Sequence, residues 1–228
     1  MALIENLIQE GWLKTPRIIE AFKKIKRVDF LPEDLKDLAE LNEALSISYG
    51  QTISQPLVVA FMLEQLQPQR GDKILDIGSG SGWTAALLGE IVGPKGKVIA
   101  IDIVPELVEF GRKNVAKYNF LAPYRPALLE KSGAGAGIEK GLPAGRQGIV
   151  EFICADGSKG YKKEAPYDKI LTSASAQSLP RAWKEQLKIG GRIVTPIGSS
   201  IWLFTKKSET DFEEIEYPGF AFVPLIEK

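Results

Sequence analysis

Apolar residues divide the chain into a helical beginning and a later alternation of strands and helices. They recur at helical spacing over residues 3–8 and again over 18–25, where Pro16 suits the start of a helix. Pro32 limits the second segment, because the residue before a proline disfavours helical backbone. A third helix is expected over residues 56–66.

Residues 46–56 read Ser-Ile-Ser-Tyr-Gly-Gln-Thr-Ile-Ser-Gln-Pro, which is typical of a loop rather than of a strand or a helix. We expect this loop to lead into the third helix with Ser54 or Gln55 near the cap, where a side-chain oxygen can accept a free backbone N–H. Residues 1–54 together are expected to form an N-terminal helical and substrate-side segment.

From residue 73 onward, short buried strands alternate with helices. Strands are expected over 73–77, 97–103, 150–155, 168–173 and 192–197, and helices over 83–92, 105–118 and 180–187. This alternation predicts a doubly wound, Rossmann-like α/β fold with a mostly parallel sheet. Residues 201–225 are strand-like, and we expect them to complete a seven-stranded sheet with antiparallel strands. A single domain is expected over residues 1–228, with its core over 55–228.

Residues 121–148 interrupt this alternation. They contain three prolines, and five glycines lie between positions 133 and 145. A connection of this length is unusual in a compact domain, so we interpret it as an exposed, flexible insertion. A tolerated surface loop is the favoured interpretation, and a lid over the substrate is the alternative.

The composition favours a water-soluble protein without a charged polymeric partner. The chain has 29 basic and 29 acidic residues, so no nucleic acid or membrane partner is expected. No apolar run approaches the ~20 residues that span a bilayer, and the first ten residues lack the basic start of a signal peptide. The single cysteine, Cys154, lies in an apolar strand and is expected to be buried. We expect a cytoplasmic monomer.

The chain has no histidine, the commonest general base and the commonest metal ligand in proteins. No metal site is therefore expected. The chemistry must also proceed without a Ser-His-Asp triad.

A glycine-rich turn, residues 76–82, follows one predicted strand and opens the next predicted helix. Its sequence is Asp-Ile-Gly-Ser-Gly-Ser-Gly, in which Gly78, Ser79 and Gly80 allow backbone to approach a ligand closely. Asp102 ends the following strand, 20 residues after Gly82, where it can accept hydrogen bonds from the hydroxyls of a ribose. The turn and this acid together predict a nucleoside-type ligand.

Two ligand classes use such a turn, and the residue before it distinguishes them. Dinucleotide enzymes place a pyrophosphate on the helix, usually with a Gly-x-Gly-x-x-Gly pattern. Here the spacing is Gly-x-Gly-x-Gly, and Asp76 would repel a pyrophosphate. A carboxylate suits a cationic ligand such as the amino group of a methionine moiety. We therefore favour S-adenosylmethionine over a dinucleotide and over a turn without a ligand.

Asp156 and Gly157 end a third predicted strand. In a doubly wound sheet they lie at the same edge as Gly78 and Asp102, so Asp156 is placed to accept from an adenine amino group while Gly157 leaves room. The alternative is an ordinary Asp-Gly turn.

Several segments, in matching order, resemble the protein-L-isoaspartate O-methyltransferase family. The most specific is residues 50–56, Gly-Gln-Thr-Ile-Ser-Gln-Pro. Further matches lie at residues 75–82, 156–157, 165–168, 186–191, 196–198 and 222–225, so the resemblance covers nearly the whole chain outside 121–148. The glycine turn alone is shared by many methyltransferases.

The resemblance implies methyl transfer from S-adenosylmethionine to the free α-carboxylate of L-isoaspartyl residues in damaged proteins. The ester then closes to a succinimide, which hydrolyses partly back to aspartate. By position, Ser54 would be the active-site serine. Cofactor contacts are implied at Thr52, Ile53, Ser54, Leu57 and Ile103. Substrate contacts are implied at Thr52, Ile53, Ser54, Phe222, Val223, Pro224 and Leu225.

A carboxylate acceptor also agrees with the missing histidine. It is already ionised at neutral pH and needs no general base. Methyl transfer from a sulfonium instead needs in-line positioning and a nucleophile stripped of water. Ser54 would then orient the carboxylate by hydrogen bonding, with a helix cap as its alternative role.

Members of the family commonly have Leu-Pro-Ile-Gly before the Gln-Thr-Ile-Ser run, whereas residues 45–48 here are Leu-Ser-Ile-Ser. This departure leaves open a methyltransferase of the same fold that acts on another carboxylate or small molecule. A third hypothesis is a binding protein that retains the fold without turnover. The intact candidate site argues against it, at Asp76, Asp102, Asp156 and Ser54.

Overall fold

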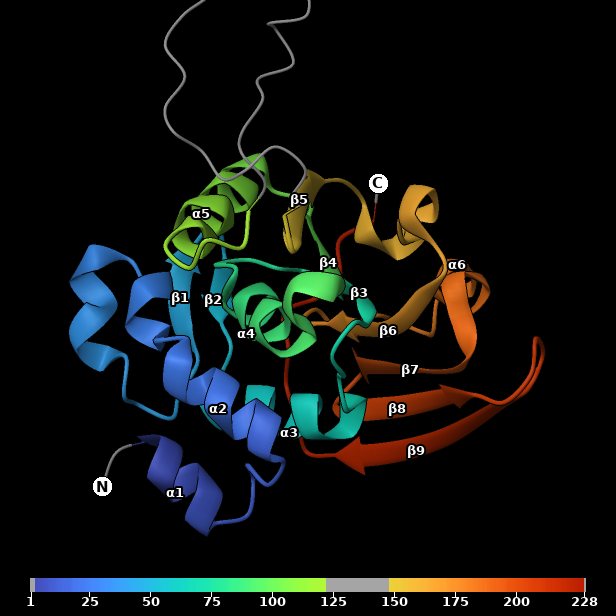
Figure 1. Cartoon of the computed structure of the whole chain (residues 1–228), viewed down its shortest axis with the longest axis horizontal. Coiled ribbons are helices and arrows are strands. Elements are labelled where there is room, and N and C mark those ends of the chain that lie inside the picture. The colour runs from blue at the N-terminus through green and yellow to red at the C-terminus, as the bar shows by residue number, and fades with distance from the viewer. Residues whose placement is uncertain (1–2, 122–147, 228) are drawn as a thin grey trace, which may run out of the picture.

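The computed structural model describes residues 3–121 and 148–227, and a seven-stranded sheet lies at its centre (Figure 1). The strand order is β5-β4-β3-β6-β7-β8-β9. The first five strands are parallel, whereas β8 runs antiparallel to β7 and β9 antiparallel to β8. The strands are β3 (Lys73–Ile77), β4 (Lys97–Asp102), β5 (Val150–Cys154), β6 (Tyr167–Thr172), β7 (Leu187–Ile197), β8 (Ser200–Lys206) and β9 (Phe212–Pro218). The predicted doubly wound α/β fold is confirmed.

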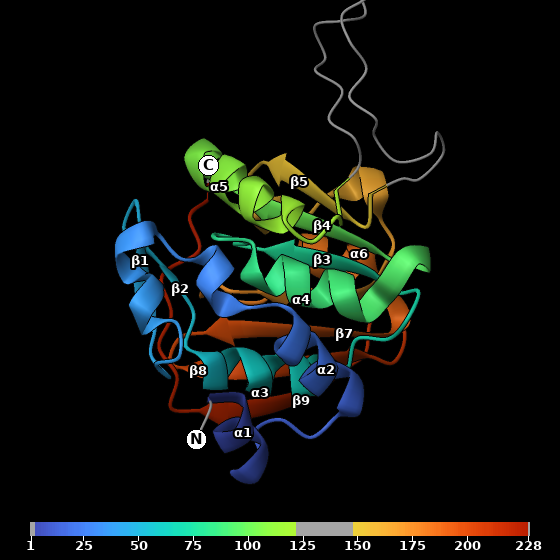
Figure 2. The ribbon, with the colours of Figure 1, turned by 60° about the vertical axis from the view of Figure 1, so that its left-hand side comes forward.

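Helices cover both faces of this sheet (Figure 2). They are α1 (Leu3–Gln9), α2 (Pro16–Lys24), α3 (Pro56–Leu66), α4 (Trp83–Val92), α5 (Pro105–Ala116) and α6 (Arg181–Gln186). In β4, Val98 and Ala100 pack with α3, α4 and α5, whereas Ile99 and Ile101 face the layer that contains α6. Burial on both faces explains why the central strands are continuously apolar rather than alternating.

The N-terminal helices extend the layer of α3 and α4. Helix α2 packs on α4, and Phe22 meets the Trp83 ring edge-on. Short 3-10 turns follow at Arg27–Phe30 and Glu33–Leu38 and lead the chain toward the carboxyl ends of the central strands. The predicted helical extension is therefore packed onto the core rather than separate from it.

The prediction of a loop over residues 46–56 was wrong. Leu45–Ser48 (β1) and Gln51–Ile53 (β2) pair as an antiparallel hairpin. Ile47 and Ile53 are buried and alternate with polar residues. Tyr49 and Gly50 at its tip have φ of 56° and 69°, the left-handed backbone that a tight turn requires. The serines and the short strand length concealed the two-residue period from sequence analysis.

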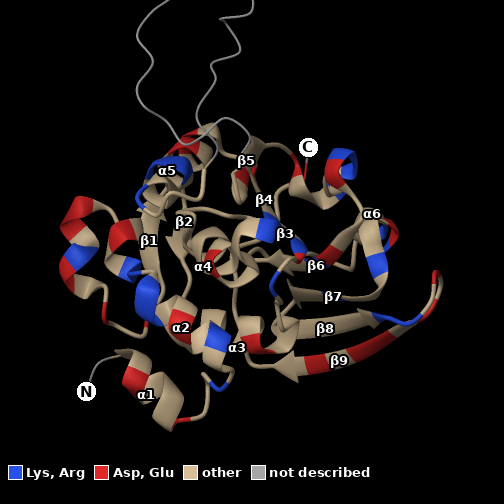
Figure 3. Cartoon of the chain, viewed as in Figure 1, with Lys and Arg blue, Asp and Glu red and all other residues tan. Residues whose placement is uncertain are grey.

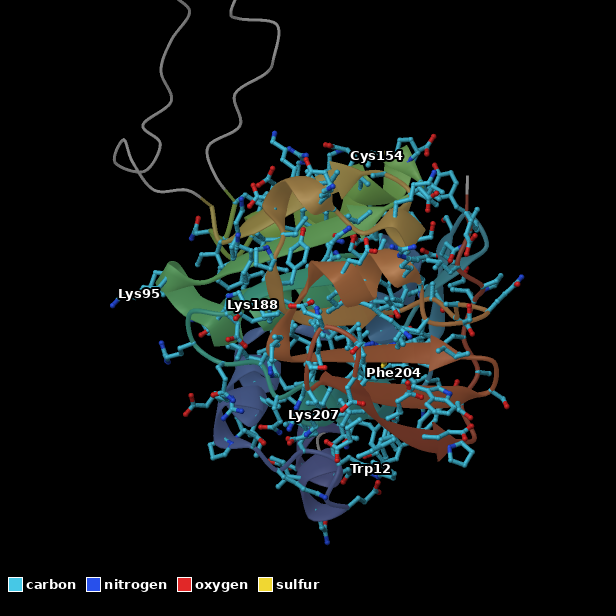
Figure 4. The ribbon with its side chains drawn as sticks, turned by 90° about the vertical axis from the view of Figure 1, so that its right-hand side faces the viewer. Trp12, Lys95, Cys154, Lys188, Phe204 and Lys207 are labelled. Carbon is cyan, nitrogen blue, oxygen red and sulfur yellow. The ribbon has the colours of Figure 1, made fainter. Side chains whose placement is uncertain are left out.

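The prediction that Cys154 is buried was also wrong. Cys154 is exposed and ends β5, which forms one edge of the sheet (Figure 4). An apolar strand is identified by its composition, but its place at the centre or the edge of a sheet depends on pairing with other strands.

Element boundaries differ by a few residues from those predicted, most of all in β7. This strand begins at Leu187 rather than near 192, because Gly190, with φ of 81°, lies in an irregularity of the pairing with β6 instead of ending a helix. The proposed insertion, residues 121–148, lies almost wholly outside the described residues.

Acidic side chains follow the other edge of the sheet. Glu213, Glu214 and Glu216 are exposed on β9 (Figure 3). Charge along an edge strand opposes pairing with another chain. No helix in the described parts of the chain is long and apolar enough to cross a membrane.

Candidate active site

An open cavity, with about 760 Å³ of empty space that includes solvent at its mouth, lies beyond the carboxyl ends of β3, β4 and β6. Ligands of open α/β sheets bind at such an edge. Most of the predicted site residues line it: Thr52, Ile53, Ser54, Gly78, Ser79, Gly80, Asp102, Ile103, Gly157, Val223, Pro224 and Leu225. Four predicted residues are not in the lining: Leu57, Asp76, Asp156 and Phe222.

The glycine turn is held against the neighbouring strand and helix. The N–H groups of Gly78 and Ser79 both donate to the Ile101 carbonyl, at 2.9 and 3.0 Å. Gly82 has φ of 84°, and a Cβ there would lie 2.9 Å from the Gly111 carbonyl oxygen of α5. Only glycine fits this close approach without displacing α5, so the turn sequence also sets how α4 and α5 pack.

Asp102 joins the end of β4 to the turn. One of its carboxylate oxygens accepts from the Gly80 N–H at 2.9 Å and the other from the Val104 N–H at 3.0 Å. Burial raises the pKa of this carboxyl, and hydrogen bonds from the backbone of Val104, Gly80 and Ile103 oppose the rise. Each oxygen keeps a second lone pair, so Asp102 has capacity for the two hydroxyls of a ribose.

Asp76 is fully buried behind the turn rather than in the cavity wall. Its Oδ2 accepts from the Thr84 hydroxyl at 2.9 Å, and Thr84 does line the cavity. Burial raises the pKa of Asp76 to about 7, the Thr84 hydrogen bond opposes this, and the charge of Asp102 adds to it. Asp76 therefore does not line the cavity itself. It is hydrogen-bonded to Thr84, and Thr84 lines the cavity.

Two buried donors in the cavity wall have no hydrogen-bond partner among the described residues. These are Ser79 Oγ and Trp83 Nε1, on residues that are 4% and 3% exposed. Gly82, the N-cap residue of α4, has no side chain to accept a hydrogen bond from the first N–H groups of the helix. Unsatisfied buried donors are costly, so these groups would suit a ligand that offers acceptor oxygens.

The Asp156–Gly157 turn makes several contacts within the protein. Asp156 Oδ1 accepts from the N–H and the hydroxyl of Ser158, at 3.0 and 2.7 Å, and Oδ2 lies 3.0 Å from Lys159 Nζ. A Cβ on Gly157 would collide with Ile77, so the glycine is needed for packing on β3. Contact of Asp156 with adenine stays a prediction.

Ser54 lies in the cavity wall just before α3 and does not cap that helix. Gln55 is the N-cap, without a side-chain cap hydrogen bond. Asn42 caps α3 from a distance instead, since its Oδ1 accepts from the Leu57 N–H at 2.9 Å and its carbonyl accepts from Gln55 Nε2. Capping is therefore not what the Ser54 hydroxyl does here.

The segment 223–225 forms another wall of the cavity. It pairs with Ser175, just after β6: the Ser175 N–H donates to the Val223 carbonyl and the Leu225 N–H donates to the Ser175 carbonyl, both at 2.8 Å. Phe222 packs into the core beside this segment. Sequence analysis missed Ser173 and Ala174 in the wall, although their place directly after a parallel strand was a signal for them.

This fold and site define the class of S-adenosylmethionine-dependent methyltransferases. The family model for protein-L-isoaspartate(D-aspartate) O-methyltransferase matches residues 1–228, and the chain belongs to that family. It is 39% identical to a protein-L-isoaspartate O-methyltransferase of Methanopyrus kandleri, over 98% of this chain and 89% of that one. It is 41% identical to protein-L-isoaspartate O-methyltransferase 2 of Archaeoglobus fulgidus, over 98% and 90%.

Solved structures agree on the fold. One is a protein-L-isoaspartate O-methyltransferase with a TM-score of 0.78 and 27% identity, covering 97% of this chain and 64% of that longer chain. Another, from Plasmodium falciparum and described as a candidate member of the same family, contains S-adenosyl-L-homocysteine. It has a TM-score of 0.78 at 22% identity, over 99% of this chain and 97% of its own.

Proposed function

We propose that this chain transfers a methyl group from S-adenosylmethionine to the free α-carboxylate of L-isoaspartyl residues in damaged proteins. The ester then closes to a succinimide that reopens partly as normal aspartate. The match to the family model over the whole chain carries this proposal. A cavity with two unpartnered buried donors beside the glycine turn supports it.

The reaction needs positioning more than proton transfer. S-adenosylmethionine, when bound, supplies a methyl group activated on a sulfonium. The acceptor carboxylate is ionised at neutral pH, so the absence of histidine is no obstacle. Ser54, in the wall between the β1–β2 hairpin and α3, donates its hydroxyl hydrogen to the acceptor and orients it. Residues 223–225 form another wall of the cavity, and they hold the substrate peptide and exclude water from its carboxylate.

The cofactor is held by residues of three strand ends. Asp102 accepts from the ribose hydroxyls, and Ser79 and the start of α4 donate to the carboxylate of the methionine moiety. Asp76 acts through Thr84. The remaining proposed cofactor contacts are Thr52, Ile53, Leu57, Gly78, Gly80, Ile103, Asp156 and Gly157.

The wider setting of the enzyme is part of the same proposal. Its substrates are damaged proteins and peptides, with neither nucleic acid nor membrane as a partner. The single cysteine, which cannot form an internal disulfide, supports a cytoplasmic location, and the acidic β9 edge supports a monomer. Packing of α2 against α3 and α4 joins the helical extension to the core and supports a single domain.

The alternative, another carboxylate or small molecule as acceptor, gains no support from the substituted loop that motivated it. Ser46 and Ser48 are exposed on β1, and neither lines the cavity. Neither the family model nor the two relatives described above point to a different acceptor.

The decisive assay is radiolabelled methyl transfer to an isoaspartyl peptide and to its normal aspartyl twin. We expect labelling of the isoaspartyl form alone. Equal labelling of both peptides would sink the proposed substrate, and cofactor binding without any labelling would favour a protein that has lost turnover.

A further inference from the structure

Arg27 is a buried cation whose hydrogen bonds all go to backbone carbonyls, one of which belongs to Ser54 in the cavity wall. It follows α2 and is 6% exposed. Its Nη1 donates to the carbonyls of Ala39 and Leu41, at 3.2 and 2.9 Å. Its Nη2 donates to those of Glu43 and Ser54, at 2.7 and 3.4 Å. One side chain therefore links the segment before β1 to the proposed active-site serine.

The positive charge of Arg27 has no ion-pair partner in the described parts of the chain. Glu40 favours the charge only from a distance, and its carboxylate accepts from the Leu3 N–H instead. Burial lowers the pKa of Arg27 to about 10, against the effect of Glu40, so the guanidinium stays charged at neutral pH. Buried charges are normally paired, because an unpaired one is costly to desolvate.

Arg27 also contacts the cavity wall at a second place. Its guanidinium carbon lies 5.5 Å from the centre of the Trp83 ring, within the range of a cation–π interaction. Trp83 is the wall residue whose Nε1 has no described partner. The cation thus stands directly behind two wall residues, Ser54 and Trp83, in surroundings where its field is weakly screened.

We propose that Arg27 is a positioning residue that holds Ser54 and Trp83 against the cavity and whose charge selects an ionised acceptor. The inference rests on the proposed function, because it concerns the acceptor side of that reaction. It accounts for an arginine that is buried without an acid beside it: the substrate carboxylate supplies the opposite charge on the cavity side of the wall, without contacting the guanidinium. A purely structural arginine would stabilise the fold without any preference for the charge of the acceptor.

Two substitutions separate positioning from charge. Arg27→Lys keeps the charge but cannot span four carbonyls, because an ammonium has three donors and no planar fork. Arg27→Met removes both. We expect kcat for the isoaspartyl peptide to fall in both variants, and KM to rise at least about tenfold, or about 1.4 kcal/mol, in Arg27→Met alone. The affinity for S-adenosyl-L-homocysteine, measured by calorimetry, should change by a smaller factor than kcat and KM for the peptide.

The charge readout compares two peptides that differ in one group. One carries the free α-carboxylate at the isoaspartyl residue, and the other carries a neutral α-amide there. Wild type and Arg27→Lys should bind the carboxylate form more tightly, and Arg27→Met should lose that preference. An unchanged preference in folded Arg27→Met overturns the charge role. If Arg27→Met does not fold, Arg27→Gln, which keeps amide donors without charge, takes its place.

Arg17 provides the matched control. It also bonds backbone and side-chain oxygens, those of Pro68 and Gln67, but neither of these two residues lines the cavity. Arg17→Lys should leave kcat, KM and the carboxylate preference unchanged; equal losses in Arg17→Lys and Arg27→Lys would show a general effect on the fold and overturn the positioning role.

A double-mutant cycle tests whether Arg27 acts through Ser54. Combining Arg27→Lys with Ser54→Ala should cost less in kcat than the sum of the two single effects, and full additivity would contradict that route. The wild-type assay on isoaspartyl and aspartyl peptides comes first. A failure there concerns the proposed function, whereas a failure confined to the Arg27 variants concerns this inference.

Discussion

At the scale of single residues, the Ser54 hydroxyl is available to a substrate because Asn42 caps the helix that follows. A serine just before a helix would ordinarily satisfy a backbone N–H at the helix start. Here a side chain from another segment has taken that role. Stability and catalysis at this point of the chain therefore depend on different residues.

This separation predicts different outcomes for Ser54→Ala and Asn42→Ala. Ser54→Ala should lower kcat by on the order of tenfold to a hundredfold, the loss of one hydrogen bond to a charged group. Its cofactor affinity and Tm should be nearly unchanged. Asn42→Ala should lower the free energy of unfolding by about 1 kcal/mol. Steady-state kinetics and thermal unfolding check both; a large fall in the Tm of Ser54→Ala would contradict the assignment.

Asp76 predicts a pH dependence of stability. Its pKa of about 7 in the folded chain lies above the ordinary aspartate value, so the folded state holds a proton that the unfolded state releases. Raising the pH through this range therefore removes stability. Asp76→Asn lacks this titration. The unfolding free energy of wild type relative to Asp76→Asn should fall from about pH 4 to about pH 7 and then level off.

Urea unfolding of both proteins across this pH range measures the difference. Acids far from Asp76 titrate equally in the two proteins and cancel, whereas Asp102, whose charge contributes to the shift, belongs to the measured difference. Parallel curves for the two proteins would mean that Asp76 does not carry a raised pKa.

At the scale of elements, the site depends on contacts between the end of β4 and the start of α4. Asp102 bonds the glycine turn through Gly80, and Gly82 brings α4 within reach of α5. Asp102, the proposed ribose ligand, thus also holds the glycine turn, which is proposed to bind the rest of the cofactor.

Asp102→Ala should therefore weaken cofactor binding much more than it changes binding of the acceptor peptide. We expect a loss of affinity on the order of tenfold or more, since the ribose contact and the support of Gly80 are lost together. KM for the isoaspartyl peptide at saturating cofactor should change little. Calorimetric titration with S-adenosyl-L-homocysteine measures the first effect, and an equal rise in the peptide KM would argue against this division of roles.

At the scale of the whole molecule, the two ends that flank residues 122–147 lie side by side. The Val150 N–H donates to the Phe120 carbonyl at 3.0 Å, and Leu121 forms a parallel bridge with Val150. The contacts of Phe120 and Leu121 with Val150 thus hold the end of the α5 segment beside the start of β5.

Replacing residues 122–147 by a short glycine-serine connection should therefore leave the fold and the reaction intact. We expect kcat, KM and cofactor affinity within about twofold of wild type. Stability should be unchanged or slightly higher, because halving a loop lowers its closure cost by only about 0.6 kcal/mol. A large rise in the peptide KM would instead support the alternative interpretation, in which this segment is a lid over the substrate.

Much of the fold and of the cofactor side of the site was predictable from local patterns. The continuous apolar strands, the prolines at helix starts and the glycine turn each express a preference of neighbouring residues. The acid at the end of β4 followed from the rule for strand ends. The hairpin over 45–53 was missed because its strands are short and their polar residues resemble a loop.

The sequence by itself determined the alternating strands and helices, the turn from Asp76 to Gly82 and the motif around Ser54, because each is a pattern within a short stretch of chain. Only the tertiary structure decided that Asn42 caps α3, that Cys154 lies at an edge and that Arg27 stands behind Ser54. These facts depend on which distant segments meet. A buried hydrogen bond or a buried unpaired charge arises only from contacts between distant segments, so no pattern within a short stretch of sequence predicts it.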